Sequence, residues 1–409
     1  MILNRSQREL LLPLGVAVAL SLTGDSTLYA VLPNQAEVVG VSLGTVGVLL
    51  GVNRLVRIPA NPLAGILNDR LGRRRLFLLG LSLGIVSTLA YGLVRGFWPM
   101  LAARLLWGSA WALINVGGYT MILDRSSRED RGRLTGFYQM FYLLGLTLSP
   151  LVGGALTDAL GFQPAVAACA GLSAVGLAVA AMALPETGPE RPAARSKPAG
   201  LRLAFGQLLA LRHSEPRVLL AAGLYFAIFF VSSGVLMSTI GLYLDQRWAG
   251  GLTVGGVGVG VASMAGGMLA LRSLLGIAAG PAAGTLSDRL RSRWPVVGFG
   301  LVLGLVGFAL LAAGGGVLSV AAGVALVALG SGALIATLAA VVGDQAAGSR
   351  QGTIMGILAT AGDAGSAAGP LLAYGLAVVM DLRWVYLLCA GTLALGLASV
   401  AAWGREARA

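Results

Sequence analysis

The sequence predicts an all-α membrane protein with twelve transmembrane helices, arranged as two pseudo-symmetric six-helix bundles. Composition is the first reason: hydrophobic residues make up 56% of the 409 residues and charged residues only 11%, whereas soluble domains carry about 25% charged residues. A repeat is the second, since the charged motif at residues 65–75 returns at residues 284–293, again between long apolar runs. We expect such a chain to cover its apolar surface with lipid.

The apolar runs are long enough to cross a membrane as helices, which requires about 20 residues for a hydrocarbon core of roughly 30 Å. They are continuous rather than alternating, which favours helices over the strands of a barrel. We identify twelve runs, at residues 11–33, 43–67, 76–95, 98–123, 134–157, 163–184, 218–244, 254–285, 295–316, 318–343, 352–379 and 384–403.

The basic residues predict the orientation. If both termini are cytoplasmic, 22 of the 29 Lys and Arg residues lie in the termini and the inner loops, and only Arg95, Arg247 and Arg383 lie in outer loops. This asymmetry is the positive-inside pattern. It predicts a multi-pass protein of the inner (cytoplasmic) membrane with both termini cytoplasmic. It also accounts for the net charge of +12 without nucleic acid, because the arginines would face anionic headgroups.

The chain divides into two halves that repeat one another. Residues 188–217 form the longest polar interruption, a predicted cytoplasmic linker between a bundle at residues 1–187 and a bundle at residues 218–409. Gly65, Asp69 and Arg70 return 219 residues later as Gly284, Asp288 and Arg289. The pattern Gly136-x8-Gly145-x3-Ser149-Pro150 returns as Gly356-x8-Gly365-x3-Gly369-Pro370, at an offset of 220. A duplicated six-helix unit is typical of transporters, which bind substrate between the repeats.

Three motifs carry a family resemblance. The stretch from Gly65 to Arg74 resembles the loop signature of the major facilitator superfamily. The stretches from Gly136 to Gly154 and from Leu101 to Gly108 resemble the fifth-helix and fourth-helix signatures of the drug:proton antiporters in that superfamily. The resemblance extends over the whole chain and implies a twelve-helix carrier that works by alternating access.

The loop motif has a physical logic of its own. Gly72 permits a tight turn between two antiparallel helices, and Asp69 can accept hydrogen bonds from nearby arginines or a helix N-terminus. We therefore expect a cytoplasmic gate, made of Gly65, Asp69, Arg70, Gly72, Arg73, Arg74, Asp288 and Arg289. The alternative is that the arginines only fix the orientation, which leaves the aspartate unexplained.

The second motif predicts close helix packing. Gly145, Ser149 and Gly153 recur every fourth residue and share one stripe, which lets another helix approach closely, while Pro150 bends the helix. The resemblance implies a hinge beside the central cavity, formed by Gly145, Ser149, Pro150, Gly153, Gly154, Gly365, Gly369 and Pro370. Ordinary close packing explains the same stripe.

Charged residues inside the spans are the candidate substrate and proton site. Each costs about 2.5–3.5 kcal/mol near a helix centre, so we expect them to face a cavity or one another. The candidate cavity residues are Asp25, Arg54, Arg57, Arg104, Trp107, Trp111, Arg272 and Asp363. We expect Asp25 to pair either with Arg104 or with the Arg54/Arg57 pair.

These observations predict a secondary active transporter that exports amphiphilic small molecules or drugs in exchange for protons. Asp25 is the first candidate for the proton carrier and Asp363 the second. The four arginines and two aspartates within the spans leave a surplus of positive charge, which favours anions. The alternative is therefore a carrier for an anionic or zwitterionic solute, or a lipid-like amphiphile, bound by these arginines. We expect a monomer without cofactor or metal, and neither an enzyme nor a channel.

Overall fold

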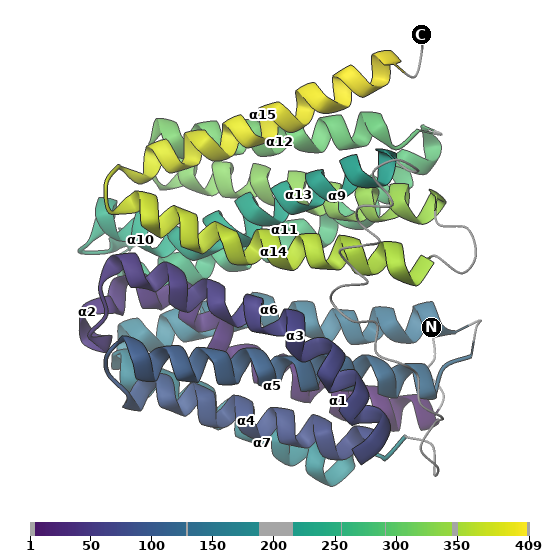
Figure 1. Ribbon diagram of the computed structural model, residues 1–409. Coiled ribbons are helices and arrows are strands. Elements are labelled where there is room, and N and C mark those ends of the chain that lie inside the picture. The colour runs from purple at the N-terminus through teal and green to yellow at the C-terminus, as the bar shows by residue number, and fades with distance from the viewer. Residues whose placement is uncertain are drawn as a thin grey trace. The chain divides into compact units, whose positions relative to one another are not determined.

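The chain is almost entirely helical in a computed structural model, which describes residues 5–127, 130–187, 216–254, 256–290, 292–345 and 351–406 (Figure 1). Residues 188–215 of the predicted linker lie outside the described part, as does the side chain of Asp69. In the first half of the sequence the helices are α1 (Arg5–Val31), η1 (Leu32–Gln35), α2 (Ala36–Val39), α3 (Leu43–Leu71), α4 (Arg73–Leu93), α5 (Phe97–Asp124), α6 (Arg131–Leu160) and α7 (Phe162–Ala183). In the second half they are α9 (Pro216–Ile228), η2 (Phe229–Leu236), α10 (Met237–Trp248), α11 (Val261–Arg289), α12 (Trp294–Ala313), α13 (Val317–Gln345), α14 (Gln351–Ala377) and α15 (Leu382–Glu406).

The described residues contain 11 helices that are long and apolar enough to cross a membrane, judged by length and composition. The twelfth predicted span corresponds to α14, which has 27 residues. Its middle reads ATAGDAGSAAG, so small residues and Asp363 lower its hydropathy below that of the others. The all-α membrane fold predicted from the sequence is confirmed.

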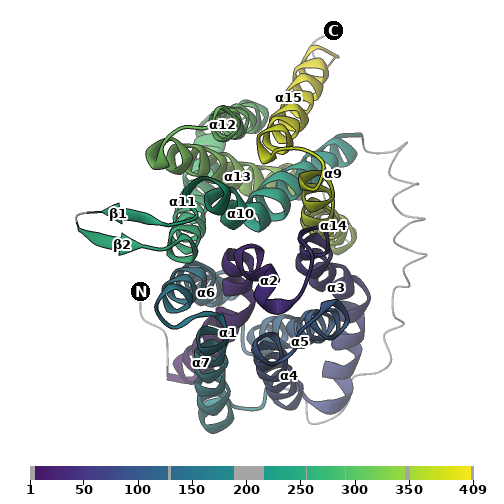
Figure 2. The same ribbon diagram turned by 90° about the vertical axis from the view of Figure 1, so that its left-hand side faces the viewer.

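Two local features depart from the predicted spans. The run expected to begin at residue 254 instead opens with an antiparallel hairpin of β1 (Leu252–Val254) and β2 (Val257–Val259), and α11 begins only at Val261 (Figure 2). Alternating Gly and β-branched residues favour this extended pairing over a helix. Within the seventh span, residues Phe229–Leu236 form a π-helix between α9 and α10.

The contacts group the chain into two compact units. One holds Met1–Pro198 together with Ile240–Ala270, and the other holds Ala199–Thr239 with Leu271–Ala409. These units are not the two halves of the sequence, because residues 240–270 join the first half. The reason is close backbone contact: a Cβ at Gly241 would lie 2.6 Å from the carbonyl oxygen of Ala30, and one at Gly266 would lie 2.1 Å from that of Pro150. The division into domains at residues 187 and 218 stays a prediction.

Each unit repeats the same helix packing. In the first, α1 packs on α6, α4 packs on α5, and α4 also packs on α7. In the second, η2 and α9 pack on α14, α12 packs on α13, and α12 also packs on α15. These pairs occupy equivalent places in the two predicted repeats, so the repetition seen in the sequence extends to how the helices pack.

Candidate functional site

A buried ion pair lies at the centre of the first unit. The Arg104 side chain on α5 is fully buried and its Nη1 donates to Asp25 Oδ1 on α1, which is 4% exposed. Asn53 Nδ2 on α3 donates to the same carboxylate oxygen at 3.1 Å. Of the two predicted pairings of Asp25, the structure therefore contains the one with Arg104.

The guanidinium of Arg104 contacts three further residues. Its Nε donates to the backbone oxygen of Leu49 at 2.7 Å, and its Nη1 also donates to the Tyr91 hydroxyl at 3.2 Å. The rings of Tyr29 and Tyr91 lie 5.6 and 5.7 Å from the guanidinium carbon. Such contacts with desolvated aromatic faces stabilise a buried cation. The pair is thus embedded in a polar network surrounded by apolar residues.

Sequence reasoning missed Asn53, Tyr29 and Tyr91, all of which are buried. Tyr29 follows Asp25 by one helical turn, and Asn53 is a polar residue in a predicted span. Both residues could have been predicted as partners of the charged residues, because a polar group buried within a span needs a hydrogen-bond partner. Tyr91 gave no such signal, since an isolated tyrosine near the end of a span is ordinary.

The predicted aromatic stripe on α5 is buried beside a second arginine. Trp107 and Trp111 stack with ring centroids 6.5 Å apart, and Trp111 also contacts Tyr142 at 5.6 Å. The guanidinium carbon of Arg57 lies 5.4 Å from the Trp111 ring, and the Arg57 side chain is buried. Arg54 lies one turn before Arg57 on α3 and is half-buried. These residues belong to the same unit as the ion pair.

In the second unit the two predicted site residues have different surroundings. Arg272 on α11 donates from Nη2 to the hydroxyls of Ser232 and Ser233, each at 3.0 Å. Both serines belong to the π-helix η2. Asp363 on α14 is half-buried and makes no ion pair with any described residue. The structure therefore does not join Arg272 and Asp363 as a pair.

The first copy of the loop motif forms a polar cluster between α3 and α4. Gly72 has φ +92°, which a residue with a side chain rarely adopts. The backbone N–H of Arg73 donates to Glu186 Oε1 at 3.1 Å, and the Arg73 side chain donates to Asp124 Oδ2 at 3.3 Å. Glu186 and Asp124 were not predicted, because they lie 113 and 51 residues from Arg73 in sequence. Gly65 has open space around it and Arg70 is exposed.

The second copy of the motif centres on Arg293. Its guanidinium donates to Asp288 at 2.9 Å and to Asp344, at the end of α13, at 2.7 Å. The hydrogen bond to Asp344 outweighs burial and raises the pKa of Arg293. Asp344 and Asp124 each end the fourth helix of their repeat, so both copies bring an arginine to an acid at the same place. Arg289 is exposed.

The predicted hinge residues make close helix contacts. A Cβ at Gly153 would lie 1.9 Å from the Thr27 hydroxyl, and one at Gly154 would lie 2.2 Å from the Ala262 carbonyl oxygen. In the second unit, Gly369 faces the backbone of Gly234, and Gly365 faces the carbonyl oxygen of Phe226. Pro150 and Pro370 lie inside α6 and α14. Both stripes therefore allow neighbouring helices to approach closely.

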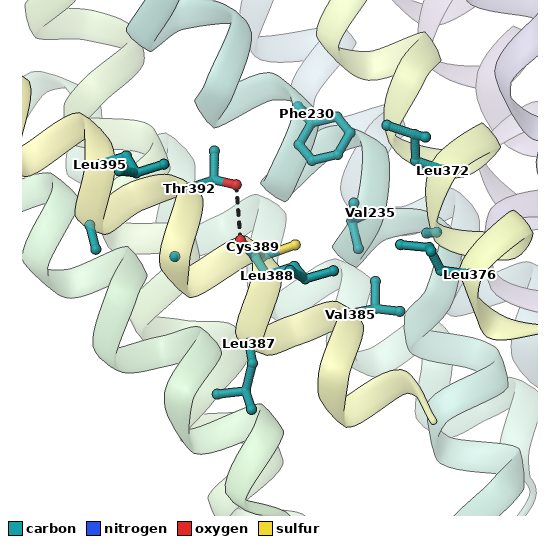
Figure 3. Close-up of a pocket in the computed structure, with 13 residues that line it drawn as sticks. Phe230, Val235, Leu372, Leu376, Val385, Leu387, Leu388, Cys389, Thr392 and Leu395 are labelled. Carbon is teal, nitrogen blue, oxygen red and sulfur yellow. Dashed lines mark hydrogen bonds between the residues drawn. The ribbon is translucent and has the colours of Figure 1, made fainter. Parts of the chain in front are cut away.

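An apolar groove of about 630 Å³ lies between η2, α14 and α15 (Figure 3). Phe230, Leu372, Leu388 and Cys389 line it, and the one hydroxyl among its lining residues, that of Thr392, donates to the carbonyl oxygen of Leu388. The lining residues include none of the predicted site residues. The lining side chains therefore suit an apolar group.

Comparison with known proteins identifies a family. The family model described as the Major Facilitator Superfamily matches residues 14–275 and 262–409. The chain is 24% identical over 210 residues to multidrug resistance protein 1 of Bacillus subtilis (strain 168), covering 51% of this chain and 48% of that protein. It is 32% identical over 114 residues to a probable vesicular acetylcholine transporter-B of Danio rerio, covering 28% and 23%. Each match thus spans less than half of the relative's length.

The fold is shared with solved transporters. A bacterial homolog to the human lysosomal transporter Spinster, in an inward-facing and occupied conformation, has a TM-score of 0.77 at 15% identity, covering 97% of this chain and 96% of that one. At this level of identity the likeness concerns the fold alone.

Proposed function

Because the chain belongs to the Major Facilitator Superfamily and is therefore a multi-pass membrane transporter, we propose that it exports amphiphilic small molecules in exchange for protons. Asp25 carries the proton in this proposal, and alternating access moves the substrate. The single observation that carries it is the fully buried Asp25–Arg104 pair with its supporting network. Charged side chains inside a membrane segment cost free energy, and such residues usually serve a function.

The pair supplies a means of coupling proton transfer to the movement of helices. While Asp25 contacts the guanidinium of Arg104, the carboxylate is stabilised as an anion. A movement of α1 relative to α5 that separates the two would leave a carboxylate in apolar surroundings, where it binds a proton. Return to Arg104 would release that proton. The Asn53 amide and the Tyr91 hydroxyl remain as hydrogen-bond partners during such an exchange.

The relatives support an organic cation as the substrate. Two of them are named multidrug resistance proteins and others vesicular acetylcholine transporters. From the sequence, we further propose a monomer in the cytoplasmic membrane with both termini inside. The Arg73 and Arg293 clusters form parts of the cytoplasmic gate, and the stripes on α6 and α14 form the hinge contacts.

A transport assay in proteoliposomes tests the proposal. Imposed pH and voltage gradients should each drive transport of a cationic dye by the wild type. In Asp25→Asn we expect transport to ignore the pH gradient, while flux down the dye's own gradient continues. Asp25→Glu keeps the acid and should retain coupling. Wild-type transport that is indifferent to the pH gradient, or full coupling in Asp25→Asn, would refute proton antiport by Asp25.

One observation favours the alternative of an anionic or zwitterionic substrate. Arg272 and the hydroxyls of Ser232 and Ser233 bring donors together at a π-helical turn, and π-helical turns are frequent at functional sites. Such donors suit a carboxylate or phosphate. Saturable transport of an anionic amphiphile in the same assay, lost in Arg272→Gln, would support this second candidate.

A further inference from the structure

We propose that Asp363, Tyr225 and Phe229 form the subsite that recognises the positive charge of an organic cation. The inference rests on the proposed function and names the class of substrate. Tyr225 and Phe229 have no role in the sequence motifs.

The packing places the residue before Asp363 against two aromatic rings. Tyr225 and Phe229 lie one turn apart, with ring centroids 4.8 Å apart. A Cβ at Gly362, the residue before Asp363, would lie 3.0 Å from Tyr225 Cε1 and 3.4 Å from Phe229 Cδ2. Asp363 is also close enough to Tyr225 to interact with it electrostatically. The carboxylate-bearing turn of α14 therefore abuts both rings.

The helix crossing keeps this arrangement in place. Gly365 and Gly369 bring α14 into backbone contact with α9 and η2, since Cβ atoms there would lie 2.4 Å from the Phe226 carbonyl oxygen and 2.4 Å from Gly234 Cα. The π-helix begins at Phe229. Its wider turn changes which side chains face α14, and π-helical turns often occur at functional sites.

The two aspartates differ in what they can still bind. Asp25 is almost fully buried and its charge is matched by Arg104. Asp363 is half-buried, as are Tyr225 and Phe229, and it makes no ion pair with the residues that the structure describes. A carboxylate beside two aromatic faces is the chemistry that recognises quaternary ammonium and phosphonium ions. Asp25 is thus suited to protons, and Asp363 to a cationic substrate.

Two probes of the same shape and opposite charge test the assignment. Binding of tetraphenylphosphonium and of tetraphenylborate to the purified full chain is measured by equilibrium dialysis. We expect the wild type to bind the phosphonium and not the borate. Asp363→Asn and Phe229→Leu should each weaken phosphonium binding at least tenfold, whereas Asp363→Glu should retain most of it. Phe226→Leu is the matched control, because Phe226 is a neighbouring aromatic residue on α9, and the atoms nearest to a Cβ at Gly362 belong to Tyr225 and Phe229 instead.

The outcomes separate this inference from the proposed function. Absence of phosphonium binding by the wild type, wild-type affinity in both Asp363→Asn and Phe229→Leu, or tighter binding of the borate would each overturn the subsite. An equal loss in Phe226→Leu would also overturn it, because the effect would then reflect the whole helix. The proposed function fails differently, when wild-type transport does not respond to a pH gradient although phosphonium binding still depends on Asp363.

Discussion

At the scale of single residues, Asp25 and Arg104 depend on one another because neither reaches water. The Arg104 side chain is fully buried; its Nε donates to a backbone carbonyl, and its Nη1 donates to a carboxylate and a phenol. A buried ion pair gains little net free energy over an apolar replacement, but removing one partner leaves an uncompensated charge. The pair therefore adds little to the stability of the fold, but the loss of either partner alone is strongly destabilising.

This dependence predicts an asymmetry between single and double variants. Asp25→Asn should lower the free energy of unfolding by about 3–5 kcal/mol, because Arg104 is left without its anion. The double variant Asp25→Asn/Arg104→Gln should recover part of that loss, since it buries no unmatched charge. Denaturant titration of the purified protein in detergent measures both. Losses that simply add in the double variant would show that the two charges are not coupled.

The charged residues of the site could be predicted from the sequence, but the residues that surround them could not. Asp25 and Arg104 stand out because ionisable residues are costly inside spans. Choosing Arg104 over the Arg54/Arg57 pair required the three-dimensional path of α1, α3 and α5. The same holds for Glu186 and Asp124, which reach the Arg73 loop only through folding.

At the scale of helices, adjacent glycines of α6 face two different neighbouring helices. Gly153 faces Thr27 on α1, and Gly154 faces the backbone of Ala262 on α11. A side chain at either position would push the helices apart. Gly145 likewise faces the backbone of Ala19, whereas Gly132 and Gly136 of the same helix have nothing within 4 Å. Close contact is therefore confined to some of the glycines of α6.

A pair of alanine variants separates the two kinds of glycine. Gly154→Ala should reduce the free energy of unfolding by about 1–3 kcal/mol, the usual cost of overpacking, because the new Cβ would lie 2.2 Å from the Ala262 carbonyl oxygen. Gly136→Ala, on the same helix with nothing within 4 Å, should gain up to about 1 kcal/mol from helix propensity. Thermal unfolding in detergent compares them. Equal effects would mean that α6 and α11 do not pack closely.

The helices could be predicted from sequence, whereas their irregularities could not. Long apolar runs and Gly turns such as Gly72 are local signals. The π-helix at Phe229–Leu236 has no such signal, because FFVSSGVL suits an α-helix equally well. The hairpin at residues 252–259 lies in a run whose valines also suit a membrane span.

At the scale of the whole chain, duplication predicted the repeated packing within each unit. It did not predict that residues 240–270 join the first half. There, Asp158 at the end of α6 accepts hydrogen bonds from the backbone N–H groups of Ala262 and Ser263, at 3.3 and 2.7 Å. An acid at a helix N-terminus is stabilising. This contact joins the first repeat to the second, so it has to break if alternating access moves the repeats apart.

A reversible cross-link at this contact tests that motion. A Cβ at Gly260 would lie 2.3 Å from Asp158 Cγ, so Asp158→Cys and Gly260→Cys place two thiols within reach of a disulfide. Oxidation of the double variant should abolish transport of the cationic dye, and reduction should restore it, because the bond holds α6 on α11 throughout the cycle.

The native Cys169 and Cys389 are buried and do not compete. The control pair, Ser42→Cys with Thr45→Cys, joins two residues of the same half whose hydroxyl oxygens lie 3.2 Å apart, and its oxidation should leave transport intact. Undiminished transport with the α6–α11 disulfide fully formed would mean that this contact persists through the cycle, and that the two repeats do not separate there.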